Sequence, residues 1–106
     1  MRLERGGGSE VNYRRGYLAE RKAAKVLEQA GYVVARTAGS HSPFDVVAVG
    51  PNGVRLIQVK RVKEGSFSAV LETAREEIRQ VPKVLGASRE VWVWLDGEGW
   101  VVQEAV

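Results

Sequence analysis

The chain has 106 residues, which is enough for one hydrophobic core and too short for two domains. Its hydrophobic content of 44% indicates a globular protein, and the absence of cysteine excludes disulfides, cysteine-ligated zinc and a thiol nucleophile. The N-terminal residues contain no apolar run typical of a signal peptide, and no segment has the roughly 18 apolar residues of a membrane span. We therefore expect an intracellular, cytoplasmic protein with no membrane partner.

The formal net charge of +3 hides an uneven distribution along the chain. Residues 1–63 contain twelve Lys and Arg against five Asp and Glu, whereas residues 64–106 contain four against eight. Charge alone supports two interpretations equally: the clustering is due to chance, or one face of the protein binds a polyanion. Residues 1–12, which include Gly6-Gly7-Gly8-Ser9, are typical of a flexible basic tail that is either solvated or in contact with phosphates. Residues 13–106 are expected to form one domain.

Hydrophobic periodicity predicts two helices and five strands. In chain order they are a helix at 13–30, strands at 32–37, 44–49 and 54–60, a helix at 67–81, and strands at 90–95 and 100–103. Gly50-Pro51-Asn52-Gly53 predicts a hairpin turn, and Pro82 is expected to end the second helix. The order α-β-β-β-α-β-β predicts an α/β fold with a mixed central sheet flanked by helices.

Four polar residues interrupt this pattern and are expected to form a site. Glu20 projects near the apolar stripe of the first helix, where a carboxylate is costly unless it is paired or binds a cation. Asp45 stands at the start of the second strand, and Gln58 and Lys60 share one face of the third. The hairpin brings the start of one strand beside the end of the next, so Asp45, Gln58 and Lys60 are expected to meet at one end of the sheet.

Such a cluster suits phosphodiester hydrolysis. Oxygen atoms of Glu20, Asp45, the Gln58 amide and the Val59 main-chain carbonyl would hold Mg²⁺, which polarises a phosphoryl oxygen and activates water. Lys60 would orient that water or neutralise charge that develops in the transition state. Taken singly, Asp45 is equally a strand cap and Lys60 a solvated lysine, but taken together the residues favour a site.

The stretch YRRGYLAERKAAKVLEQAGYVVARTAGSHSPFDVVAVGPNGVRLIQVK, residues 13–60, resembles the N-terminal core of archaeal-type Holliday-junction resolvases. The blocks A-E-R, R-T-A-G-S and F-D-V-V-A occur in the family's order. The resemblance implies a PD-(D/E)xK restriction-endonuclease-like fold. It also implies an endonuclease dependent on Mg²⁺ or Mn²⁺, without a further small-molecule cofactor, that acts as a homodimer and nicks two opposed strands of four-way junction DNA.

The resemblance also assigns individual roles. Glu20 matches the family's helix carboxylate, Asp45 its metal-binding aspartate and Lys60 its catalytic lysine. The family's arginine after the helix acid corresponds to Arg21, and its arginine and serine beside the active site correspond to Arg36 and Ser40. A serine in this loop also suits a turn. The basic residues expected to flank the site, about half of them in contact with phosphates, are Arg14, Arg15, Arg21, Lys22, Arg36, Arg61 and Lys63.

The sequence departs from the family at Gln58, where most members carry glutamate. A neutral amide still coordinates a cation but contributes no charge, so metal binding should weaken. Three alternatives to an active junction resolvase follow: an inactive engineered variant, a non-catalytic junction-binding protein, or another PD-(D/E)xK endonuclease of the restriction or repair kind. A purely structural dimerisation module leaves Glu20, Asp45 and Lys60 unexplained.

Several other residues have a structural and a functional interpretation. His41 in the loop beside Asp45 is a possible substrate contact, but an exposed loop histidine is more common. Glu72, Glu76 and Glu77 make the second helix acidic, so its face is not expected to lie on DNA. In the strand at 90–95, the two tryptophans, Trp92 and Trp94, alternate with apolar residues, which predicts a strand covered on both faces, by the core and by a second subunit, rather than a base-stacking platform.

Overall fold

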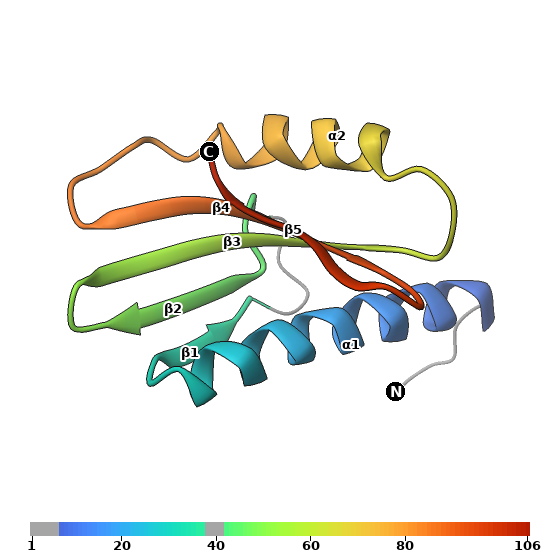
Figure 1. Cartoon of the computed structure of the whole chain (residues 1–106), viewed down its shortest axis with the longest axis horizontal. Coiled ribbons are helices and arrows are strands. Elements are labelled where there is room, and N and C mark those ends of the chain that lie inside the picture. The colour runs from blue at the N-terminus through green and yellow to red at the C-terminus, as the bar shows by residue number, and fades with distance from the viewer. Residues whose placement is uncertain (1–6, 38–41) are drawn as a thin grey trace.

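The computed structural model describes residues 7–37 and 42–106, which form an α/β fold of two helices and five strands (Figure 1). The elements are α1 Gly7–Gln29, β1 Val33–Arg36, β2 Val46–Gly50, β3 Gly53–Val62, α2 Ser68–Ile78, β4 Ala87–Leu95 and β5 Gly99–Ala105. Their order is the one that the periodicity predicts. No helix in this part of the chain is both long enough and apolar enough to cross a membrane.

The five strands form one mixed sheet in the order β1-β2-β3-β4-β5. Neighbouring strands are antiparallel except β3 and β4, which are parallel and are joined by the crossover helix α2. In Figure 1, α1 and α2 lie on opposite sides of the sheet. This arrangement confirms the expected mixed central sheet flanked by helices.

A tight hairpin joins β2 to β3 and sets the register between them. Gly50 pairs with Gly53 across the turn, as the Gly50-Pro51-Asn52-Gly53 motif predicts. Gly53 has a φ of 136°, and a Cβ atom there would lie 2.3 Å from the carbonyl oxygen of Gly86. That same oxygen accepts the Val54 N–H at 2.7 Å. Only glycine fits at position 53, because the α2–β4 connection passes directly against it.

Two hydrophobic clusters fix the helices to the two faces of the sheet. On the α1 side, the buried residues are Ala19, Ala23 and Leu27 of the helix and Val46, Ala48, Ile57, Val59 and Trp92 of the sheet. On the α2 side, they are Ala74 and Ile78 of the helix and Val62, Val91 and Val93 of the sheet. Successive residues of β4 therefore face opposite helices, which confirms that this strand is covered on both faces. Burial against a second subunit remains a prediction.

The N-terminal boundary differs from the sequence-based expectation. Helix α1 begins at Gly7, so residues 7–12 belong to the helix and not to a flexible tail. Ser9 and Glu10 are residue types favoured near a helix N-terminus, and glycine destabilises a helix by only about 1 kcal/mol relative to alanine. Residues 1–6 lie outside the described part of the chain. Helix α2 ends at Ile78, three residues before the predicted end and four before Pro82.

Candidate active site

Asp45 directly precedes β2 and binds the backbone of β3. Its N–H donates to the carbonyl oxygen of Ile57 at 2.8 Å, which extends the β2–β3 ladder by one residue. Its Oδ2 atom accepts the N–H of Val59 at 2.9 Å. Thr37, which follows β1, donates its N–H to the Asp45 carbonyl oxygen at 2.9 Å. These bonds place the Asp45 carboxylate beside the second half of β3, as the hairpin predicts.

Gln58 and Lys60 lie on the face of β3 that α2 covers, and both contact Glu77 of that helix. The Nε2 atom of Gln58 donates to Oε1 of Glu77 at 2.8 Å, and Nζ of Lys60 lies 3.0 Å from the same oxygen. Gln58 is buried, with 5% exposure, whereas the Lys60 side chain is 31% exposed. The shared face of Gln58 and Lys60 is therefore confirmed, and it is completed by a carboxylate from another element.

Glu20 approaches the same edge of the sheet from α1. Its Oε1 atom lies 3.6 Å from Nη1 of Arg36, at the end of β1. The Arg36 guanidinium also lies over the ring of Tyr17, 4.2 Å from its centroid. Nη1 of Arg36 is buried and has no hydrogen-bond partner among the described residues.

Burial disfavours the ionised forms of the Glu20 and Asp45 carboxylates. Burial, and to a lesser extent the nearby Asp45, raise the pKa of Glu20 to about 7, although Arg36 opposes the shift. Burial also raises the pKa of Asp45, although the Val59 N–H and Lys60 oppose the shift. Glu77 adds to the rise at Asp45. A bound cation would stabilise the ionised forms of both carboxylates.

The raised pKa of Glu20 predicts that the stability of the metal-free protein depends on pH. The folded-state pKa of Glu20 lies above its ordinary value of 4.5, so the protonated form stabilises the fold. That contribution is complete below about pH 4.5 and is lost as the pH rises through about 7. In EDTA, we expect the free energy of unfolding to fall by about 1–3 kcal/mol from pH 5 to pH 8, after allowance for partial solvent screening. Urea denaturation across this range measures the change.

The matched variant for this pH dependence is Glu20→Gln, which removes the titrating group while keeping its size. We expect its unfolding free energy to change less between pH 5 and pH 8 than that of the wild type. A wild-type profile that is flat, or that rises, contradicts the assignment of a raised pKa to Glu20.

The oxygen atoms at this edge fit a hard divalent cation. Within residues 7–37 and 42–106, no three His, Cys, Asp or Glu side chains are grouped closely enough to hold a metal ion by themselves. Mg²⁺, however, is commonly held by one or two carboxylates and completed by water. Glu20 and Asp45 are such carboxylates, and the Gln58 amide and Val59 carbonyl are neutral oxygen donors on the adjoining strand. The raised pKa values of the two carboxylates, whose ionised forms a cation would stabilise, support this fit.

A basic hollow on the surface of α1 is lined in part by Arg36, the partner of Glu20. It has a volume of about 470 Å³, and its charged lining residues are Arg21, Lys22, Lys25, Glu28 and Arg36. Arg21 and Lys22 are exposed, and Lys22 also lies over the Trp94 ring at 4.8 Å. The structure thus brings three of the predicted phosphate contacts together and adds Lys25. The helical spacing of positions 21, 22 and 25 is a signal that would have identified Lys25.

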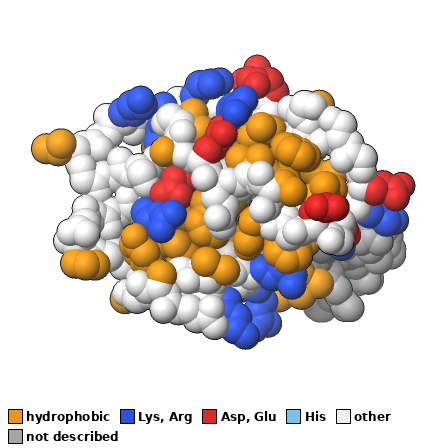
Figure 2. All heavy atoms as spheres, viewed as in Figure 1, with side chains coloured by type: hydrophobic (Ala, Val, Ile, Leu, Met, Phe, Trp, Pro, Cys, Tyr) orange, Lys and Arg blue, Asp and Glu red, His pale blue; other side chains and the backbone are white. Residues whose placement is uncertain are grey.

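The remaining predicted DNA contacts are not gathered at this hollow. Arg61 forms a bidentate pair with Asp96, with Nε–Oδ1 and Nη2–Oδ2 distances of 2.9 and 2.5 Å. Lys63 is exposed beyond the end of β3. On the face displayed in Figure 2, acidic and basic side chains lie beside each other, so that face is not uniformly basic. The side chains of Arg14 and Arg15, and the whole of Ser40 and His41, lie outside the described part of the chain.

Glu77 lies beside the candidate site, at a position that the sequence interpretation did not assign to it. We expected Glu77, with Glu72 and Glu76, to make α2 acidic so that its face does not lie on DNA. The Glu77 side chain instead contacts Gln58 of β3. Glu76 is exposed and Glu72 pairs with Arg75 at 3.1 Å. Position 77 continues the helical spacing of Val70, Ala74 and Val81. An acidic residue on an apolar stripe is the same signal that identified Glu20.

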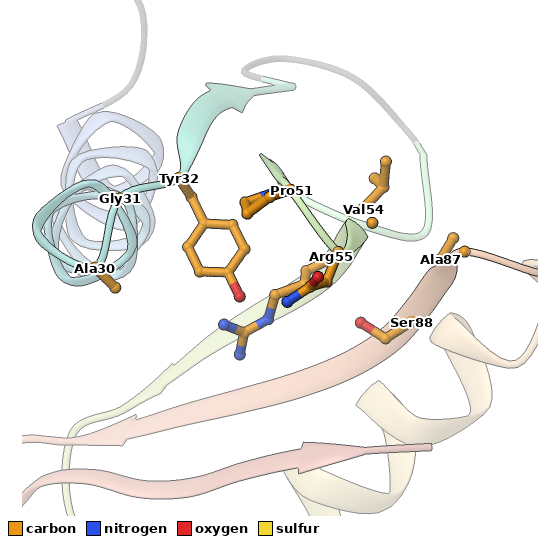
Figure 3. Close-up of a pocket in the computed structure, with 11 residues that line it drawn as sticks. Ala30, Gly31, Tyr32, Pro51, Val54, Arg55, Ala87 and Ser88 are labelled. Atoms are coloured by element: carbon orange, nitrogen blue, oxygen red, sulfur yellow. The ribbon is translucent and has the colours of Figure 1, made fainter.

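A second concave region lies at the opposite end of the sheet, against the β2–β3 hairpin (Figure 3). It has a volume of about 460 Å³ and is lined by the end of α1, the hairpin and the start of β4. Arg55 is the charged residue in this lining, and its guanidinium is bound by Glu90 at 2.7 and 2.8 Å. Ser88 and Trp92 also donate to Glu90, which is 7% exposed. This network satisfies a buried charge and does not belong to the candidate active site.

The fold and the site define a class: a nuclease with a PD-(D/E)xK-like fold, in which an aspartate before one strand meets a Gln-x-Lys segment on the next. The chain belongs to the archaeal Holliday junction resolvase (Hjc) family, whose family model matches residues 11–105. It is similar to Hjc of Archaeoglobus fulgidus, a Holliday junction resolvase from an archaeal hyperthermophile, solved at 1.6 Å resolution. The two chains are 27% identical over 81% of this chain and 69% of that chain, with a TM-score of 0.54. These findings confirm the expected family and fold.

Proposed function

We propose that this protein resolves four-way DNA junctions by hydrolysing one phosphodiester in each of two opposed strands. The observation that carries this proposal is the convergence of Glu20, Asp45 and Lys60 at one edge of the sheet in a member of the resolvase family. Carboxylates and a lysine on neighbouring elements are the groups that metal-assisted phosphodiester hydrolysis requires.

Each site residue has a defined task in this reaction. Glu20, Asp45, the Gln58 amide and the Val59 carbonyl would hold Mg²⁺, or Mn²⁺ in its place, and no other small-molecule cofactor is needed. The chemistry that the bound ion supplies is polarisation of the phosphoryl oxygen and activation of water. Lys60 stabilises the negative charge that develops on the phosphoryl group, because its ammonium group lies at the same edge as Asp45.

The basic hollow on α1 would position the DNA. The hollow is lined by Arg21, Lys22, Lys25 and Arg36, and the Arg36 guanidinium lies 3.6 Å from Glu20, so a phosphate bound there would be near the candidate cleavage site. Contacts of this kind recognise the spacing of phosphates and not the bases, which suits a substrate defined by its shape. A four-way junction presents two equivalent cleavage points, and a two-fold homodimer would address both. The substrate is DNA, so we place this activity inside the cell.

A cleavage assay tests the proposal. We expect the protein with Mg²⁺ or Mn²⁺ to introduce paired symmetric nicks into a labelled immobile four-way junction and to leave linear duplex of the same sequence intact. EDTA should abolish cleavage. Equal cutting of the duplex would instead identify a restriction-like or repair-like endonuclease. Tight junction binding without cleavage in either metal would identify a junction-binding protein, and sedimentation of the complex would show whether the bound species is a dimer.

A further inference from the structure

The ammonium group of Lys60 is held by a carboxylate from another element of the fold. Nζ of Lys60 lies 3.0 Å from Oε1 of Glu77, a residue in the last turn of α2. Nε2 of Gln58 donates a hydrogen bond to the same oxygen at 2.8 Å. Two alternate residues of β3, one charged and one neutral, therefore converge on a single atom of the helix that covers this face.

The position of the Lys60 ammonium depends on this contact. A lysine carries its charge on a flexible four-carbon stem, so the ammonium samples many positions unless a partner restricts it. The Lys60 side chain is 31% exposed, so packing does not enclose it. Lys60 also opposes the rise in the pKa of Asp45, so its charge acts on that carboxylate. The ion pair with Glu77 therefore restricts the ammonium to the neighbourhood of Asp45, where the proposed reaction needs a positive charge.

Gln58 in turn restricts Glu77. The Gln58 side chain is buried in the sheet-helix interface, whereas that of Glu77 is 38% exposed. The buried amide donates a hydrogen bond to the more exposed carboxylate and so fixes its orientation. An ionised glutamate at position 58 would have no proton to donate and would repel Glu77. The amide at position 58 and the acid on the apolar stripe of α2 are therefore explained together.

We propose that Glu77 is a positioning residue for the catalytic Lys60, and that Gln58 holds Glu77 in place through its amide. The inference rests on the proposed nuclease function, in which Lys60 stabilises charge on the phosphoryl group. The competing interpretation is that Lys60 and Glu77 form a surface ion pair that has no effect on the reaction. A partly exposed ion pair contributes little to the stability of a fold, so the two interpretations differ mainly in the order of Lys60 and in the rate of cleavage.

The order of the Lys60 side chain is measured first, in EDTA and without DNA. The ¹⁵N order parameter of the Lys60 ammonium is determined by NMR in the wild type, Glu77→Gln, Gln58→Met and Glu76→Gln, and Lys60→Met identifies the signal by removing it. Glu76→Gln is the matched control because Glu76 is an exposed acid that neighbours Glu77 on the same helix. Circular dichroism and thermal melting establish that each variant is folded.

We expect the order parameter of the Lys60 ammonium to fall by about a third or more in Glu77→Gln. It should fall by a smaller amount in Gln58→Met, which keeps the length of the side chain but removes the donor, and stay unchanged in Glu76→Gln. An unchanged value in Glu77→Gln overturns the proposal. An unchanged value in Gln58→Met overturns the part of it that concerns Gln58.

Single-turnover cleavage of a four-way junction is measured second, as a double-mutant cycle. We expect Glu77→Gln to lower the rate at saturating protein by about tenfold without changing the affinity for the junction. In the Lys60→Met background, the same change should alter the rate by less than about twofold, because Glu77 acts through Lys60. The proposal is overturned if Glu77→Gln cuts like the wild type, or if its loss of rate is equally large in the Lys60→Met background.

The two measurements separate this inference from the proposed function. If Lys60 loses order in Glu77→Gln but the wild type cuts no junction, Glu77 still positions Lys60 and the proposed resolvase function falls. If the wild type cuts junctions and Glu77→Gln keeps both the order of Lys60 and the rate, the function stands and the inference falls.

Discussion

Asp45→Asn is expected to lower the rate of junction cleavage by about 10³-fold or more while leaving the fold intact. The Asp45 carboxylate accepts the Val59 N–H at 2.9 Å. The charged groups near it are those of Glu20, Lys60 and Glu77. Asparagine keeps an oxygen that can accept the Val59 N–H, but it removes the negative charge that a divalent cation requires. Single-turnover cleavage of a four-way junction measures the loss.

Stability separates this effect from unfolding. Burial raises the pKa of Asp45, so a neutral amide costs less to bury there than an ionised carboxylate. At pH 8, we expect the free energy of unfolding of Asp45→Asn to be equal to that of the wild type or higher by up to about 1 kcal/mol. Glu98→Gln, at an exposed position in the β4–β5 turn, is the control. Retained cleavage by Asp45→Asn would remove Asp45 from the catalytic site.

Lys60→Met is expected to lower the cleavage rate by about 10²–10³-fold without weakening metal binding. Methionine keeps most of the aliphatic side chain but removes the ammonium group that stabilises charge on the phosphoryl group. The same change leaves Glu77 without its cationic partner, which lies at 3.0 Å in the wild type. Mn²⁺ affinity should therefore stay constant or increase while catalysis falls. Calorimetry without DNA, together with single-turnover cleavage, resolves the two quantities.

Lys83→Met is the matched control for Lys60→Met, because Lys83 is an exposed lysine in the connection between α2 and β4. We expect its cleavage rate to lie within about threefold of the wild type. If Lys60→Met loses Mn²⁺ affinity in proportion to its loss of cleavage, Lys60 supports the metal site and not the transition state. If both lysine variants cut like the wild type, Lys60 has no catalytic role.

The site combines residues from both faces of the sheet. Glu20 comes from α1 on one face of the sheet and Glu77 from α2 on the other, while Asp45 lies at the edge, where β2 begins. The carboxylates are therefore held by three different elements and not by one loop. A change in the packing of either helix against the sheet is expected to alter the site even when it touches no charged residue.

The sequence by itself determined the features that depend on short-range periodicity. The alternation of strand residues, the apolar stripes of the two helices and the glycines of the β2–β3 turn predict the element order and the mixed sheet. The hairpin between Asp45 and Gln58 is also local, so the proximity of Asp45, Gln58 and Lys60 followed from the turn and the strand register. The helix carboxylate Glu20 was detectable because it lies on an apolar stripe.

Only the tertiary structure decided which distant side chains meet. The contact of Glu77 with Gln58 spans nineteen residues, and that of Arg61 with Asp96 spans thirty-five. Both depend on how the α2 crossover places β4 beside β3 and the helix over that pair. Residue periodicity fixes which face a side chain occupies, but the distance between two faces is set by the packing of the elements that carry them. Only the tertiary structure therefore shows that Arg61 forms an ion pair with Asp96 and that Glu77 lies beside the candidate active site.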